Sequence, residues 1–325
     1  MSNCRGCGIL LQTENKTKMG YIPEEKKNEA LCQRCFKIRN YNEFSEGKVK
    51  TNREIIESIN KDETFVFFLV DLLNINDEML ESYYAIKKPK SLVLTKIDYW
   101  PKSLKKEKIA SWLKRTLGIQ EELLFISTKR KESYKSLLNR LKEKKLKQAY
   151  LVGYTNVGKS TLINALKEEK AVTTSVYPNT TLNFIKIKIE ELTLIDTPGL
   201  QYSSQLVKNQ KFYKKINPKK ELKPITYQLK KGASLLIEDF IRIENKSEKA
   251  NLTLYVNNEL QITKIYEKNN TLKEACKNKK KLKKNEDLVL NAIGFINFKT
   301  ETEVMIYTKE EMEIAKRESI FGEKE

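Results

Sequence analysis

The residues from Gly153 to Ser160 carry the strongest chemical signal in the chain. They fit the pattern G-x4-G-K-[ST], follow an apolar run at 149–152 and open an amphipathic stretch. The glycines let backbone N–H groups curl around phosphates, and a helix that begins there adds the positive end of its dipole. We therefore predict a nucleoside triphosphate site in which Lys159 reaches the β- and γ-phosphates and Ser160 binds Mg²⁺. The predicted contacts of this loop are Gly153, Tyr154, Thr155, Asn156, Val157, Gly158, Lys159, Ser160 and Thr161.

A second motif, Asp196-Thr-Pro-Gly199, ends the apolar run at 192–195. Its carboxylate suits the Mg²⁺ shell, and the N–H of Gly199 suits the γ-phosphate. Between the two motifs, Thr180 and Thr181 follow Pro178-Asn179. Either threonine completes the Mg²⁺ shell when the γ-phosphate is present, which would order the segment. The three parts predict binding of a nucleoside triphosphate.

The residues that select the base precede the phosphate loop. Thr95-Lys96-Ile97-Asp98 follows the apolar run at 92–94, and Ser127-Thr128-Lys129 follows the run at 123–126. Asp98 can accept two hydrogen bonds from the N1–H and N2–H₂ edge of guanine, a donor pair that adenine lacks. Lys96 would pack its stem along the base, and the backbone at 127–128 would meet guanine O6. Alone, T-K-x-D also fits an exposed charged loop; with the other motifs it predicts GTP.

Because base selection precedes phosphate binding along the chain, these motifs predict a circularly permuted GTPase domain. Short apolar runs alternate with amphipathic stretches at 104–117 and 134–146, which favours an α/β fold with a mostly parallel sheet. Alternating lysines at 184–189 predict a half-exposed edge strand, antiparallel to its neighbour. The predicted organisation is a zinc finger at 1–50, a permuted G domain at 51–210 and a basic β-rich domain at 211–325.

Four cysteines lie in two C-x-x-C pairs near the start of the chain, 24 residues apart: Cys4, Cys7, Cys32 and Cys35. The chain has no histidine, which leaves four thiolates as the full zinc site available and excludes any histidine base. The alternative is a set of unrelated reduced thiols. Cys276 is interpreted as a bystander.

The formal charge of +19 favours a polyanionic partner, and residues 201–284, with 21 basic and 8 acidic residues, hold +13 of it. Runs at 235–243, 252–256, 262–266, 288–296 and 303–307 predict strands, and the lysine-rich segment 277–284 predicts an exposed loop. We predict RNA phosphate binding; the alternative is a merely solvated basic face. The predicted contacts are Lys211, Lys214, Lys215, Lys219, Lys220 and 277–284. Four tyrosines either stack on bases or belong to the core: Tyr213, Tyr227, Tyr255 and Tyr266.

The N-terminus shows no basic segment followed by an apolar one, and the longest apolar run, 65–73, is short for a membrane span. These features predict a soluble, cytoplasmic protein without a membrane partner. We expect a monomer.

The stretches GYTNVGKSTLINAL, PNTTL, DTPGL and PKKELKPITYQL, and KRES at 316–319, make the chain similar to the YqeH family of ribosome-assembly GTPases. The resemblance implies GTP hydrolysis linked to assembly of the small (30S) ribosomal subunit, and a C-terminal domain likened to an RNA- or peptide-binding module. Thr95 stands where the family carries Asn, which removes an amide that braces the nucleotide loops. Asn179 stands where the family usually carries Gly.

Leu200 follows the D-T-P-G motif, where other GTPases carry a catalytic glutamine, and leucine cannot orient water. The resemblance to GTPases with a hydrophobic residue here implies a K⁺ ion held partly by Asn156; the alternative role for Asn156 is a loop-bracing amide. The predicted catalytic residues are Lys159, Asn156 and Gly199. The predicted function is a GTPase switch that binds rRNA, with weak intrinsic turnover stimulated by K⁺ and the ribosome. The alternative is a nucleotide-regulated RNA-binding scaffold with incidental turnover.

Overall fold

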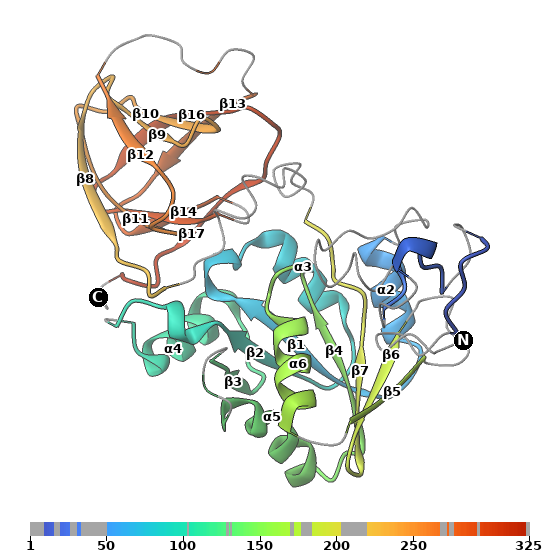
Figure 1. Cartoon of the computed structure of the whole chain (residues 1–325). Helices are drawn as coiled ribbons and strands as arrows, with labels where there is room; N and C mark the ends of the chain where they lie inside the picture. The colour runs from blue at the N-terminus through green and yellow to red at the C-terminus, as the bar shows by residue number, and fades with distance from the viewer. Residues whose placement is uncertain are drawn as a thin grey trace.

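A computed structural model describes most of the chain, and Figure 1 gives its overall arrangement. An α/β part with one seven-stranded sheet is followed along the chain by a β-rich part with two five-stranded sheets. Both parts agree with the predicted fold class. The described residues are 10–15, 20–26, 31–33, 51–102, 104–127, 130, 132–169, 172–176, 184–202, 220–266, 272, 276–290 and 293–322.

The seven-stranded sheet has the order β3-β2-β1-β4-β7-β6-β5. Strands β3, β2, β1, β4 and β7 are parallel to one another, whereas β6 is antiparallel to both β7 and β5. Strand β6 was predicted at a sheet edge; this is wrong, because β5 pairs along its outer side. The strands are β1 (Phe65–Asp71), β2 (Lys90–Thr95), β3 (Leu123–Phe125), β4 (Gln148–Gly153), β5 (Val172–Val176), β6 (Ile185–Ile189) and β7 (Leu192–Asp196).

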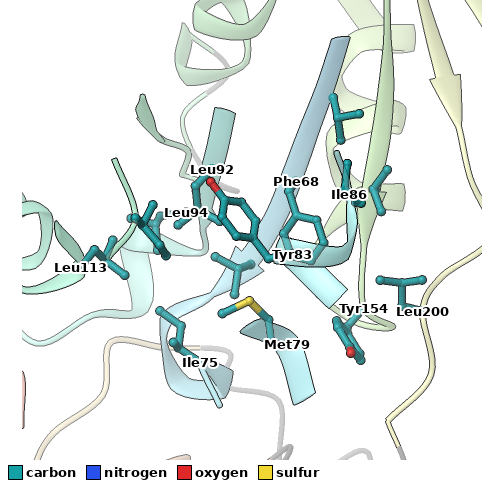
Figure 2. Packing of buried hydrophobic residues seen from close by; sticks show 14 of the residues in the cluster. Phe68, Ile75, Met79, Tyr83, Ile86, Leu92, Leu94, Leu113, Tyr154 and Leu200 are labelled. Atoms are coloured by element: carbon teal, nitrogen blue, oxygen red, sulfur yellow. The ribbon is translucent and has the colours of Figure 1, made fainter. Parts of the chain in front are cut away.

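Helices cover both faces of this sheet, so its central strands are apolar throughout. Along β1, Val66 and Phe68 face a core with α2, α3 and α4, whereas Phe65 and Phe67 face a second core with α5 and α6. Figure 2 shows the first core, with Phe68 and Tyr83 side by side. The helices are α2 (Asn52–Ile59), α3 (Asp77–Ala85), α4 (Lys106–Leu117), α5 (Glu132–Glu143) and α6 (Lys159–Glu169), with short 3₁₀ turns η1 (Glu24–Lys26), η2 (Leu72–Asn74) and η3 (Ile97–Tyr99).

The β-rich part is a pair of antiparallel sheets that enclose their own core (Figure 1). One sheet has the order β12-β9-β10-β16-β13 and the other β17-β14-β15-β11-β8. Its strands are β8 (Ile225–Lys230), β9 (Ser234–Ile237), β10 (Ile241–Asn245), β11 (Lys249–Val256), β12 (Ile262–Ile265), β13 (Cys276–Leu282), β14 (Glu286–Leu290), β15 (Gly294–Phe298), β16 (Thr302–Thr308) and β17 (Ile314–Glu318).

The predicted exposed loop at 277–284 is wrong, because most of it forms strand β13. This strand pairs with β16, and the alternation of side chains leaves Lys277, Lys279 and Lys281 exposed while Leu282 enters the core. The runs predicted as single strands at 235–243 and 288–296 are each two strands joined by a tight turn.

The two parts are joined by contacts on one side of the seven-stranded sheet. Arg317 Nη1 donates to Ile75 O at 2.6 Å, and its buried guanidinium lies 5.2 Å from the Trp112 ring. Trp112 Nε1 donates to Glu318 O at 3.0 Å, and Leu222 N donates to Tyr99 O at 2.9 Å. The β-rich part therefore docks on η2, η3 and α4.

Candidate functional site

The predicted nucleotide motifs meet at the carboxyl-terminal ends of the parallel strands of the seven-stranded sheet. Because β2, β1, β4 and β7 are parallel, the loops that follow them all leave the sheet at this end. Those loops hold the T-K-x-D, phosphate-loop and D-T-P-G residues. Thr180 and Thr181 lie outside the described residues, as do Thr128 and Lys129.

The phosphate loop runs from the end of β4 to the start of α6, as its sequence predicts. A Cβ on Gly153 would lie 2.7 Å from Leu69 O, so only glycine fits there. Asn156 and Gly158 have φ values of 65° and 98°, the left-handed region that Asn and Gly tolerate best. Ser160 and Thr161 are exposed at the first turn of α6, where their hydroxyls are open to a ligand.

Lys159 and Asp196 come together in this site. The buried Lys159 Nζ lies 3.1 Å from Asp196 Oδ1 and also donates to Thr197 O. A triphosphate would compete with these oxygens for the ammonium group, since it offers several anionic acceptors. Within the described part of the chain, the buried Thr155 Oγ1 of this loop has no hydrogen-bond partner. The oxygen donors Ser160 and Asp196 suit Mg²⁺.

Two predicted contacts of the loop face away from any ligand. The Tyr154 ring is buried, and its hydroxyl lies 2.7 Å from Ser82 Oγ and donates to Glu78 O at 2.9 Å. Burial raises the pKa of Tyr154, so the hydroxyl stays protonated. Val157 is also buried in the core. Both residues can therefore offer a nucleotide only their backbone groups.

Thr95 braces the phosphate loop despite lacking an amide. Its hydroxyl lies 2.6 Å from Val157 O and 3.1 Å from Val70 O. The family's amide is absent here, as the sequence predicts, but a buried hydroxyl donor ties the loop that holds T-K-x-D to the phosphate loop.

Asp71 is a site residue that sequence reasoning missed. It ends the apolar strand β1, is 4% exposed, and its Oδ2 lies 2.9 Å from Lys96 Nζ. Lys96 itself has φ 56°. This ion pair anchors the ammonium of Lys96, while Asp98 lies half-buried in η3. The signal was present as a single charge at the end of a run of six apolar residues.

The second guanine loop is arranged by Ser133, which the sequence did not single out. Ser127 N donates to Ser133 Oγ at 3.1 Å, and that hydroxyl lies 2.9 Å from Ser127 O. Ser127 N–H is therefore engaged within the protein. The predicted contact of the 127–128 backbone with guanine O6 is therefore not available to this N–H while the Ser133 hydrogen bond is in place.

Leu200 closes the D-T-P-G segment against the phosphate loop. Its side chain is fully buried beside Tyr154, as Figure 2 shows. Its backbone N–H donates to Gly153 O at 3.0 Å, and its carbonyl accepts from Thr155 N at 2.9 Å. The Leu200 side chain therefore belongs to the core, and its backbone ties the D-T-P-G segment to the phosphate loop.

The predicted zinc ligands are described only in part. Cys32 is 1% exposed and packs with Leu11 and Ile22. Cys4, Cys7 and Cys35 lie outside the described residues. The residues that are described contain no cluster of three or more metal-ligating side chains.

The predicted RNA-contacting residues divide by environment. Tyr255 stacks on Phe295 and Phe321 in the core, whereas Tyr266 is 68% exposed with Lys264 Nζ 4.9 Å from its ring. Tyr227 packs against the core of the β-rich part. Lys211, Tyr213, Lys214, Lys215 and Lys219 lie outside the described residues, and Lys220 is exposed.

The fold and the convergence of these motifs define a circularly permuted P-loop GTPase. Residues 41–205 match the family described as RsgA GTPase, and residues 148–292 match the family described as 50S ribosome-binding GTPase. The protein YqeH of Bacillus subtilis is 35% identical over 279 residues, which cover 80% of this chain and 76% of that protein. The chain therefore belongs to the YqeH family of RsgA-type GTPases, and it is a GTPase.

More distant relatives extend this comparison. The ribosome biogenesis GTPase A of Bacillus pumilus is 33% identical over 172 residues, 48% of this chain and 60% of that protein. A chloroplastic GTP-binding protein of Arabidopsis thaliana, named for brassinazole insensitivity and pale green leaves, is 26% identical over 309 residues; the match covers 77% of this chain but 47% of that protein. Among the described residues, no helix is long and apolar enough to cross a membrane.

The hydroxyl brace gives a testable expectation for Thr95. Thr95→Val keeps the shape of the side chain but removes the donor to Val157 O, and the loss of a buried hydrogen bond costs about 1–2 kcal/mol. We expect GDP to bind about 5- to 30-fold more weakly, measured by titration calorimetry. Thr95→Asn should retain tight binding.

Thr253→Val is the matched control, because Thr253 is a buried threonine of the β-rich part whose hydroxyl lies 3.1 Å from Thr226 Oγ1. It should lower the melting temperature without changing the Kd for GDP. Equal GDP affinity in the wild type and Thr95→Val would contradict the brace.

Proposed function

We propose that this GTPase assists assembly of the small (30S) ribosomal subunit in the cytoplasm, as a monomer that binds rRNA through its β-rich part. Family membership and the resemblance of the motifs to those of YqeH proteins support the ribosomal role. The observation that carries the RNA contact is strand β13, which presents three exposed lysines at the outer edge of a sheet.

The lysines of β13 suit phosphate contacts that depend on charge. Lys279 and Lys281 lie 2.9 and 3.1 Å from the carboxylates of Glu303 and Glu301, but their side chains are 61% and 72% exposed. Exposed ion pairs are weak, so phosphates can compete for the ammonium groups. Lysine neutralises phosphates as a point charge and does not read bases by paired hydrogen bonds, which favours salt-sensitive binding.

In this proposal the γ-phosphate acts on the 178–200 region, in which β6 and β7 already form strands, and so sets the affinity for rRNA. Hydrolysis then permits release. The guanine base is selected by Asp98, with Lys96 and the 127–129 loop beside it. Lys159 and the N–H of Gly199 would contact the β- and γ-phosphates, and Mg²⁺ held by Ser160, Asp196 and a switch threonine would neutralise phosphate charge. A scaffold with incidental turnover is the alternative, and the 50S subunit is a second candidate partner because one matching family is described as 50S ribosome-binding.

Co-sedimentation with purified 30S and 50S subunits tests the partner. We expect binding to 30S subunits that differs between GDP and a non-hydrolysable GTP analogue. Replacing Lys277, Lys279 and Lys281 all by Gln should weaken binding. The slope of log Kobs against log salt concentration should become shallower by about 2. Lys142, Lys144 and Lys145, which lie at the far end of the molecule near α5, provide a control of equal charge change (Figure 1).

Four results would contradict parts of this proposal. Equal binding to both subunits in every nucleotide state contradicts a nucleotide-dependent switch. Binding to 50S alone supports the second candidate partner. Equal weakening by the two sets of Gln substitutions shows that net charge and not β13 carries the contact. Hydrolysis that 30S subunits leave unchanged, measured in single turnover, favours the scaffold.

We also propose that a K⁺ ion, held in part by Asn156, supplies positive charge near the reacting phosphates. Two observations support this role. Leu200 is buried, and Asn156 lies in the phosphate loop with a left-handed backbone. GTP hydrolysis should be faster in KCl than in NaCl, and Asn156→Asp, which tolerates the same backbone angle, should abolish the difference. Asn164→Ala, at an exposed position of α6, should retain it. Equal wild-type rates in both salts would contradict a K⁺ site.

The N-terminal cysteines are proposed to hold one Zn²⁺ in a structural site of four thiolates. The buried position of Cys32 supports a structural role. Metal analysis should find about one zinc per chain, lost in Cys32→Ser and at acidic pH as the thiolates protonate. Cys276→Ser, which alters an exposed cysteine of β13, should keep the metal. Zinc retained in full by Cys32→Ser would argue against this site.

A further inference from the structure

The backbone of Gln201, two residues after Gly199, is held by a side chain from a distant part of the chain. Asn52 Nδ2 donates to Gln201 O at 2.8 Å, and Gln201 N donates to Asn52 Oδ1 at 2.8 Å. One amide thus satisfies both backbone groups, as a paired residue in a neighbouring strand would. Asn52 begins α2, and a capping box between Thr51 and Glu54 fixes the start of that helix.

The residues on either side of Gln201 are fastened as well. Leu200 is bound to the phosphate loop through hydrogen bonds with Gly153 and Thr155. The ring of Tyr202 stacks on Tyr154 with centroids 4.4 Å apart. Leu200 and Tyr202 are therefore fastened to the phosphate loop, and Gln201 between them is fastened to Asn52.

The upstream end of the same loop is also fixed. Thr197 Oγ1 donates to Leu151 O at 2.9 Å, which ties the end of β7 to β4. Only Pro198 and Gly199 lie between the two fastened ends. A Cβ on Gly199 would be 3.1 Å from Thr155 Cγ2, so this short span lies directly against the phosphate loop.

We propose that Asn52 is a positioning residue for GTP hydrolysis. By holding Gln201, it fixes the downstream end of the span and keeps the N–H of Gly199 where the γ-phosphate is predicted to lie. A donor that is already in place stabilises developing charge without reorganisation during the reaction. The proposal rests on the predicted contact of Gly199 and is independent of the ribosomal partner.

Helix α2 offers a matched control at its other end. Asn60 Nδ2 donates to Ala85 O at 2.9 Å, and Lys87 N donates to Asn60 Oδ1 at 2.9 Å. Asn60→Ala therefore removes an equivalent pair of hydrogen bonds at the other end of α2, which bind backbone groups between α3 and β2. Asn52→Ala and Asn60→Ala should destabilise the protein by similar amounts.

Single-turnover hydrolysis at saturating GTP separates the two asparagines. We expect Asn52→Ala to slow hydrolysis about 10-fold or more, because a small displacement of a reacting geometry is costly. The Kd for GDP should stay within about threefold of the wild type, and Asn60→Ala should hydrolyse GTP at the wild-type rate. Asn52→Asp keeps the acceptor and a favourable charge at the helix start but loses the donor, so it should be slow with little loss of melting temperature.

Equal rates for Asn52→Ala and Asn60→Ala would overturn the proposal, as would a wild-type rate for Asn52→Asp. Gly199→Ala separates the role of Gly199 in hydrolysis from the role of Asn52 in positioning it. If it is slow while the Asn52 variants are normal, Gly199 matters but Asn52 does not position it. Gly199→Ala keeps the N–H but presses a Cβ against Thr155, so a wild-type rate would show that the position of this span does not limit hydrolysis, and the role of Asn52 would fall with it.

Discussion

The parallel arrangement of β2, β1, β4 and β7 is the constraint on which the site depends. Parallel strands deliver their following loops to the same edge of a sheet, whatever their order along the chain. The base-selecting residues can therefore precede the phosphate loop in sequence and still meet it in space. Permutation changes the order of the motifs along the chain but not where their loops lie. The hydrogen bond from Thr95 to Val157 shows that the T-K-x-D loop and the phosphate loop still contact each other directly.

The motifs predicted the site where local sequence determines local geometry. G-x4-G-K-S fixes a strand, a loop with left-handed residues and a helix start, and all three are present. Residues that act through partners distant in sequence were missed. Asp71 and Asn52 have no motif, because each acquires its role only when the fold brings a second loop against it.

Prediction of the β-rich part failed for a different physical reason. Hydrophobic runs locate buried strands, but they do not locate tight turns within a run, so two pairs of strands were merged. A strand at a sheet edge can be exposed along most of its length. In β13 only Leu282 is buried in the core, and the outward-facing positions are lysines. Charge density alone therefore gave no sign of the pairing with β16 that orders the segment.

The docking of the β-rich part changes how nucleotide state can reach it. In sequence, the chain that follows Gly199 leads from the switch segment to the β-rich part. Among the described residues, however, the hydrogen bonds between the two parts involve Ile75, Asn76, Tyr99, Trp112 and Arg115, next to the base-selecting loop. Tyr99 follows Asp98 directly, and its carbonyl holds Leu222 at the start of the β-rich part. Arg317 pairs with Asp287 inside the β-rich part and also donates to Ile75 O, so separating the two parts would break that hydrogen bond and expose a buried ion pair to water. The predicted guanine end of the site is thus joined to the β-rich part by the Tyr99–Leu222 hydrogen bond, whereas the segment that follows Gly199 is joined to α2 through Asn52. The two ends of the predicted GTP site therefore have different neighbours in the same GTPase fold.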